Sequence, residues 1–163
     1  MKKILLFILL SFFISPVSYS KIITLKDCYS EMNEMKSLDK NLYDEYKFVI
    51  DTDKKIVNYV IVWSDKEMKK NKREVDGLLQ RNNERSLGLN TSRLESLRNE
   101  KIQSKLFNII KYTDDEVVAE LEKIQGRKFR QSINVNLKKN TILNTTEIIV
   151  PSYYKSSYTY FCK

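Results

Sequence analysis

The strongest constraint on the fold is a stretch in which apolar and polar residues alternate on both sides of a turn, EYKFVIDTDKKIVNYVIVW at residues 45–63. A turn centred on Asp53 and Lys54, or a four-residue loop over 52–55, gives the same register. That register opposes three apolar pairs: Ile50 with Val57, Phe48 with Tyr59, and Tyr46 with Ile61. Because directly opposed residues share one face of a sheet, the pattern predicts a β-hairpin with one buried face.

A second stretch repeats this design near the end of the chain, RQSINVNLKKNTILNTTEIIV at residues 130–150. The residues Ile133, Val135 and Leu137 alternate before a Lys-Lys-Asn turn, and an apolar strand from Ile142 to Val150 follows it. The sequence therefore predicts a second hairpin, although its register is less constrained than that of the first.

Residues 114–125, between the two hairpins, allow two readings. A helix capped by Thr113 and Glu116 would bury Val117, Leu121 and Ile124 and stop at Gly126. A return strand after a Thr-Asp-Asp turn would present Val117, Ala119 and Leu121 on one face instead. We favour the strand because it gives the predicted strand Leu106–Tyr112 a neighbouring partner.

Residues 64–104 differ in composition from the rest of the chain. Seventeen of these 41 residues are charged, ten basic and seven acidic, and the few leucines are too far apart to form a full core face. We predict one or two short, mobile helices inserted between strands. Because acidic residues are interleaved with the basic ones and no aromatic side chain is present, the segment is not predicted to bind nucleic acid.

These elements predict an all-β fold, mainly an antiparallel β-meander that forms a small barrel or sandwich, with a charged helical or loop insertion. The predicted organisation is a signal peptide over residues 1–20 followed by a single β domain over 21–163, with 64–104 as the insertion. Residues 1–20 carry Lys2 and Lys3, an apolar run, and the small residues Ser18 and Ser20 where a signal peptidase would cut.

The apolar run of the leader is shorter than the roughly 20 residues of a membrane-spanning helix, so cleavage is favoured over an uncleaved anchor. A lipid-anchored form is not expected, since the large and charged residues Leu-Lys-Asp precede Cys28. Together with a composition typical of AT-rich bacterial genomes, this predicts a periplasmic or secreted protein that does not span the membrane after cleavage.

The chain contains two cysteines, Cys28 and Cys162, near the two ends of the predicted mature domain. An exported protein meets an oxidising compartment, so we predict a disulfide between them. This would hold the final segment, YYKSSYTYFCK, in which Tyr154, Tyr158, Tyr160 and Cys162 share one face of a strand. That face is interpreted either as ordinary core or, with Tyr154, Tyr158 and Tyr160 lining a cavity, as a ligand platform.

Signals for catalysis are weak. The chain has no histidine, which excludes Ser-His-Asp and Cys-His catalysis, and no cofactor or metal site is predicted. The clustered carboxylates, Asp51 with Asp53 and Asp114–Glu116, fall at predicted turns, where aspartate is common. We therefore expect a non-catalytic exported binding protein of the cell envelope, for a small apolar or amphipathic ligand or another envelope component. The alternatives are a carboxylate-dependent hydrolase and an inhibitor or adaptor that binds a protein partner through residues 64–104.

Overall fold

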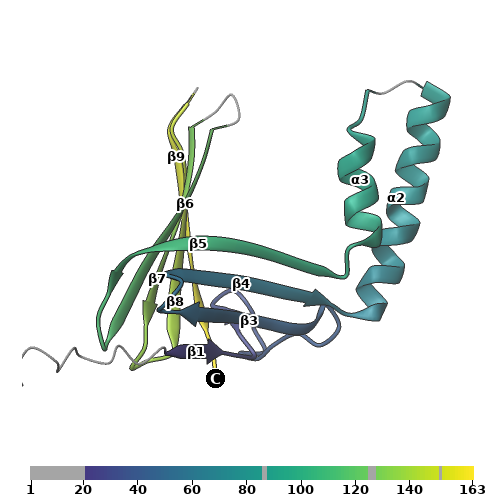
Figure 1. The fold of residues 1–163 in the computed structure, drawn as a ribbon. Helices are drawn as coiled ribbons and strands as arrows, with labels where there is room; N and C mark the ends of the chain where they lie inside the picture. The colour runs from purple at the N-terminus through teal and green to yellow at the C-terminus, as the bar shows by residue number, and fades with distance from the viewer. Residues whose placement is uncertain (1–20, 86–87, 125–127, 151) are drawn as a thin grey trace, which may run out of the picture.

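The computed structural model of the chain describes residues 21–85, 88–124, 128–150 and 152–163, and the predicted signal peptide, residues 1–20, lies outside them. The strands form one nine-stranded antiparallel sheet, in the order β1-β3-β4-β5-β6-β7-β8-β9-β2, which curls into a half-barrel (Figure 1). The strands are β1 Ile22–Leu25, β2 Tyr29–Ser30, β3 Tyr43–Asp51, β4 Ile56–Trp63, β5 Ile102–Tyr112, β6 Glu116–Ile124, β7 Lys128–Asn136, β8 Thr141–Ile148 and β9 Tyr154–Phe161. The all-β prediction is confirmed, with the strands in a curled sheet.

The first hairpin, β3 and β4, has the register that the sequence predicts. The pairs are Ile50 with Val57, Phe48 with Tyr59, and Tyr46 with Ile61. Residues 52–55 form a four-residue connection between the last paired residues, Asp51 and Ile56. Because the three apolar pairs fall on the concave face, this hairpin supplies one wall of the core.

Residues 116–124 form strand β6, so the return-strand prediction is confirmed and the alternative helix is wrong. The physical reason is that β6 pairs with a strand on each side, β5 and β7. Val117 and Ala119 are fully buried, opposite Val135 and Ile133 of β7. A helix over the same residues would leave β5 and β7 without the neighbour that completes their backbone hydrogen bonding. The second predicted hairpin is present as β7 and β8, with Val135 opposite Ile142.

The core lies on the concave face of the sheet. Its largest fully buried side chains are those of Phe48 and Phe107, surrounded by aliphatic residues from β3 to β8. Leu25 of β1 and Leu38 of the 31–42 loop also belong to this cluster. Strands β3 and β7 alternate between buried and more exposed residues, as one-sided burial of a sheet requires.

The sheet forks between β5 and β6. The two strands pair as far as Asn108 with Glu120, and a bulge between Ile109 and Lys111 interrupts their register. A bulge bends its strand and increases the local twist. Beyond the fork, residues 121–124, 128–131, 145–148 and 154–157 of the last four strands continue as a projection, here named the β6–β9 arm (Figure 1).

The charged insertion forms two antiparallel helices, α2 Asp65–Arg85 and α3 Thr91–Asn99, which project from the end of the β4–β5 pair (Figure 1). The predicted helical insertion is confirmed, but α2 is longer than the short helices expected. Residues 102–104, which the prediction placed in the insertion, belong to β5. Ser64 caps α2, because its Oγ accepts a hydrogen bond from the Glu67 N–H at 3.1 Å.

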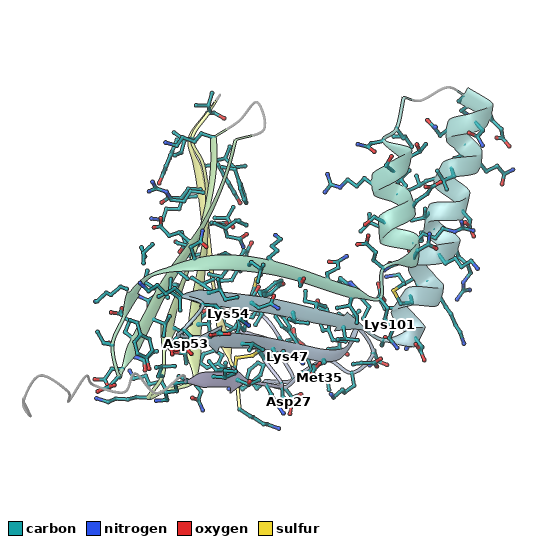
Figure 2. The ribbon with its side chains drawn as sticks, viewed as in Figure 1. Asp27, Met35, Lys47, Asp53, Lys54 and Lys101 are labelled. Carbon is teal, nitrogen blue, oxygen red and sulfur yellow. A yellow bond between two sulfur atoms is a disulfide. The ribbon has the colours of Figure 1, made fainter. Side chains whose placement is uncertain are left out.

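A lysine fixes the base of the helical pair. The Lys101 ammonium group lies 2.9 Å from the Asp44 carboxylate of β3 and 2.7 Å from that of Asp65 at the start of α2. Figure 2 shows Lys101 where the helices meet the sheet. The ion pairs and the backbone bond from Trp63 N–H to the Lys101 carbonyl, 2.9 Å, join the helices to the strand ends.

The N-terminal segment connects the two edges of the sheet. Strand β1 pairs with β3, whereas β2 pairs with β9. Asp27, between them, has a φ of 47°, a left-handed conformation that aspartate tolerates better than most residues. Lys26 and Lys163 exchange two backbone hydrogen bonds of 3.0 and 2.8 Å, and the predicted disulfide between Cys28 and Cys162 is present, drawn as a yellow bond in Figure 2.

Among the described residues, neither helix is long and apolar enough to cross a membrane.

Candidate ligand-binding site

A pocket of about 360 Å³ opens where β2, β3, β4 and β9 meet the loop over residues 31–42. Side chains of the concave face form its walls, and the loop forms its rim. We refer to it as the tyrosine pocket. Its lining residues are Cys28, Tyr29, Ser30, Met32, Asn33, Leu38, Asp39, Leu42, Tyr43, Tyr46, Tyr59, Ile61 and Tyr160.

Four tyrosine rings from three strands pack against one another in the wall of the tyrosine pocket. The ring of Tyr46 is central, with centroids 5.6 Å from Tyr43, 5.3 Å from Tyr59 and 5.4 Å from Tyr160. The contacts with Tyr59 and Tyr160 are edge-to-face, a geometry that aromatic quadrupoles favour. The ring of Trp63 extends the cluster, 5.1 Å from Tyr43.

The hydroxyl groups of two of these tyrosines meet in the wall. Tyr46 Oη donates a hydrogen bond to Tyr59 Oη over 3.2 Å. Burial raises the pKa of Tyr46 and the pKa of Tyr59 above the ordinary value of tyrosine, and burial is also the first cause of the raised pKa of Tyr43. These three tyrosines are therefore uncharged at neutral pH, and their hydroxyl groups are polar atoms of the wall.

Hydrogen bonds hold the rim in place. The Glu31 N–H donates to the Thr159 carbonyl at 2.8 Å, and the Glu31 carboxylate accepts from the Thr159 N–H at 3.1 Å. Leu38 is buried under the loop, while the Met32 side chain lines the tyrosine pocket and is 72% exposed. Asp39 is the charged residue of the lining, and its Oδ1 accepts the Asn41 N–H at 2.9 Å. A mostly apolar wall with polar groups at the rim is typical of sites for small amphipathic molecules.

The three predicted tail tyrosines lie on the concave side of β9 but at different distances from the tyrosine pocket. Tyr160 lines it and packs against the core. Tyr158 and Tyr154 lie farther along β9, opposite Asn144 and Ile148, and are 40% and 56% exposed. Neither belongs to the pocket lining or to the core cluster, so the ring of Tyr160 is the one that the structure brings to the pocket.

The predicted carboxylate clusters lie at turns and pair with lysines. Asp51 lies 3.2 Å from the Lys54 ammonium group, and Glu116 lies 2.6 Å from that of Lys111. A hydrogen bond from the Lys54 backbone lowers the pKa of Asp51, and one from the Lys111 side chain lowers the pKa of Glu116. A general acid needs the opposite shift. In the described part of the chain, no group of three or more acidic or cysteine side chains is arranged to hold a metal ion.

Sequence reasoning missed Tyr43, Tyr46 and Tyr59 as pocket residues. The hairpin pattern places Tyr46 and Tyr59 on the buried face, but the pattern alone does not distinguish core from a cavity wall. A usable signal was the position of Tyr43 and Tyr46 toward the end of the hairpin away from its turn. The missing information was that Cys28 contacts this end, since its N–H donates to the Tyr46 carbonyl at 3.1 Å.

Comparison of the chain with protein-family models, with curated protein sequences and with solved structures finds no match to any of them.

Proposed function

We propose that this chain is a non-catalytic, exported binding protein of the cell envelope whose tyrosine pocket takes a small amphipathic ligand. The observation that carries the proposal is the cluster of Tyr43, Tyr46, Tyr59 and Tyr160 around a pocket of about 360 Å³. That volume falls in the range of small-molecule sites, about 300 to 1,000 Å³.

The lining sets the chemistry of the ligand. Four aromatic rings offer faces and edges to a flat or aliphatic body, and Ile61 and Leu42 add apolar surface. Hydrogen bonds from the ligand go to tyrosine hydroxyls or to Ser30 and Asn33 in the lining. We therefore propose a molecule with an apolar body and one polar end, either free or as part of a larger envelope component. The exposed rings of Tyr154 and Tyr158 extend the aromatic face along β9 for a longer ligand.

The proposed compartment is the periplasm or the exterior of the cell. The disulfide between Cys28 and Cys162 supports it, because such bonds persist in oxidising compartments. The leader at residues 1–20 supports it from the sequence. The carboxylate-dependent hydrolase and the adaptor that binds through residues 64–104 stay predictions, and the tyrosine pocket favours neither of them.

The proposal can be tested with the fluorescent amphipath anilinonaphthalene sulfonate. Trp63 is the single tryptophan of the chain and contacts the pocket residue Tyr43, so energy transfer from Trp63 reports bound probe, and the variants then test whether it lies in the tyrosine pocket. We expect saturable transfer in the folded protein. The variant Met32→Glu places a negative charge at the rim and should weaken binding of the anionic probe about fivefold, which corresponds to roughly 1 kcal/mol of repulsion across water.

The matched control is Met35→Glu, which adds the same charge to the same loop at a residue that is 70% exposed and outside the pocket lining. It should leave probe affinity unchanged. Tyr158→Ala then measures how far the site extends, because weaker binding in this variant places part of the ligand on the aromatic face of β9. Absence of saturable transfer in the wild type, or equal losses in the two methionine variants, contradicts the proposal.

A further inference from the structure

Strand β5 has an open edge. Its residues 102–108 pair with β4, but its pairing with β6 reaches only to Asn108. The Ile109 N–H donates to the Lys55 carbonyl at 2.8 Å, and the Lys101 carbonyl accepts from Trp63, so the odd-numbered residues turn their backbone groups toward β4. Those of Ile102, Ser104 and Leu106 consequently point away from β4, and the structure places no other described strand against them.

The two faces beside this edge differ in chemistry. On the convex face, Ile102 is 62% exposed and Leu106 is 55% exposed, with Ser104 between them. A hollow of about 660 Å³ runs between β5 and α3, and it extends from the concave face to the edge itself. Its lining is Tyr59, Ile61, Arg93, Ser96, Glu100, Ile102, Gln103, Ser104 and Lys105. An edge strand with exposed apolar side chains is one that proteins normally cover.

The surroundings of the edge favour a single extended chain as its partner. The helices α2 and α3 rise at one end of β5 and the β6–β9 arm rises near the other, so the edge lies between two projections (Figure 1). A bare strand fits lengthwise between them, whereas a second copy of this domain would have to bring its own projections into the same space. The hollow is lined by both basic and acidic side chains, Arg93, Glu100 and Lys105, and Lys105 Nζ donates to Gln131 Oε1 at 3.5 Å.

We propose that the edge of β5 from Ile102 to Leu106 binds an extended segment of a partner protein as an additional strand. Backbone groups of Ile102, Ser104 and Leu106 supply the hydrogen bonds, as in other cases of strand addition. Alternate side chains of the segment are apolar where they lie beside Ile102 and Leu106, and polar where they face the hollow. This inference does not rest on the function proposed for the tyrosine pocket.

The test uses the whole folded protein and a labelled synthetic peptide. The peptide has about eight residues, enough to cover the edge at about 3.3 Å per residue, and alternates valine with threonine or glutamate. We expect saturable binding by fluorescence anisotropy, and slowed hydrogen exchange at the amides of Ser104 and Leu106. A peptide of the same composition in scrambled order should bind at least about tenfold more weakly, because its apolar residues no longer share one face.

The decisive variant is Ser104→Pro. The Ser104 N–H points away from β4, so proline removes no bond of the sheet, and edge strands accept proline at such positions. Loss of one hydrogen bond at the centre of the edge should lower peptide affinity about tenfold. The matched control is Ile110→Lys, on the same strand at a residue that is 61% exposed but lies beyond the open edge, and it should bind normally.

A second test keeps the wild-type protein and changes the peptide. Methyl groups on every second backbone nitrogen should abolish binding in one frame and preserve it in the other, because only one set of amides faces β5. Equal binding by both methylated peptides, full affinity in Ser104→Pro, or no binding of the alternating peptide by the wild type overturns the proposal. A concentration-dependent dimer that Ser104→Pro dissociates would assign the edge to a second copy and would likewise overturn it.

Discussion

Among single residues, Tyr46 connects the core to the tyrosine pocket. Tyr46 is only 5% exposed, and its ring contacts the rings of Phe48, Tyr59 and Tyr160. Burial raises the pKa of Tyr46 and of Tyr59, whereas the same tyrosines in the unfolded chain ionise near pH 10. Because the raised pKa belongs to the folded state, this contribution to stability is complete below about pH 10 and is lost as the pH rises above it.

The variant Tyr46→Phe tests this coupling. At neutral pH it removes the hydrogen bond to Tyr59 and should lower the free energy of unfolding by about 1 kcal/mol. Between about pH 9 and pH 11 its stability should fall less steeply than that of the wild type, because one fewer phenol is held protonated by the fold. Urea denaturation at several pH values measures both effects. The control Tyr158→Phe, at a ring that is 40% exposed, should match the wild type at neutral pH, and an unchanged alkaline slope in Tyr46→Phe would show that the coupling is absent.

Among the elements, the α2–α3 pair is the one with the least connection to the core. Val75 is its buried residue, and it does not belong to the core cluster. The ion pair of Arg98 with Asp76, 2.8 Å, joins the two helices to each other. Replacing Glu67–Glu100 by a short Gly/Ser linker should therefore change the free energy of unfolding little. The entropy of closing a loop depends only weakly on its length, by about 0.6 kcal/mol for each twofold change.

That replacement keeps Ser64, Asp65 and Lys101, so the base of the insertion retains its contacts with β3. The measurement is urea unfolding followed by circular dichroism in the β region, with the wild type as reference. We expect one cooperative transition at nearly the same urea concentration. Loss of the cooperative transition would place the helices within the folding unit of the sheet.

Elements with local partners could be predicted from the sequence, and those with distant partners could not. The β3–β4 register followed from alternation around a short turn, where opposed residues are close in the chain. The fork between β5 and β6 could not be predicted, because the extra residue at Ile110 leaves no pattern that distinguishes a bulge from a regular strand. The length of α2 was underestimated for a related reason. It packs against α3 over part of its length, and its one buried residue, Val75, gives almost no apolar periodicity.

At the scale of the whole molecule, the N-terminal segment and the end of β9 meet at what we call the seam. It consists of the Cys28–Cys162 disulfide and the backbone pairing of Lys26 with Lys163. The cysteines and the alternating tail were visible in the sequence, and so was Tyr160 as a candidate site residue. The tyrosine pocket itself was not, because it needs Cys28, the β3–β4 hairpin and β9 at one place. The contacts of β9 with Cys28 and with Tyr46 span more than a hundred residues. Contacts of such sequence separation follow from the closure of the sheet and not from any local period.

Removing the disulfide measures how much this seam contributes. In the chain-entropy model, a loop of this length stabilises the fold by up to about 5 kcal/mol. The double variant Cys28→Ala with Cys162→Ala should lower the melting temperature by up to about 15 °C for a domain of this size. Calorimetry on the variant and on reduced wild type should agree. Mass spectrometry of the unreduced protein should find the two cysteine peptides linked, and an unchanged melting temperature after reduction would show that the backbone pairing of Lys26 with Lys163 suffices.

The same bond makes most of the described chain a covalent ring, since 134 positions separate its two cysteines. A protease that cuts the ring once, for example within the projecting α2–α3 pair, leaves two fragments that the disulfide still joins covalently. The nicked protein should run as a single band on a non-reducing gel and separate into two fragments only after reduction. A chain closed in this way keeps its nine described strands covalently attached to one another after a first cleavage.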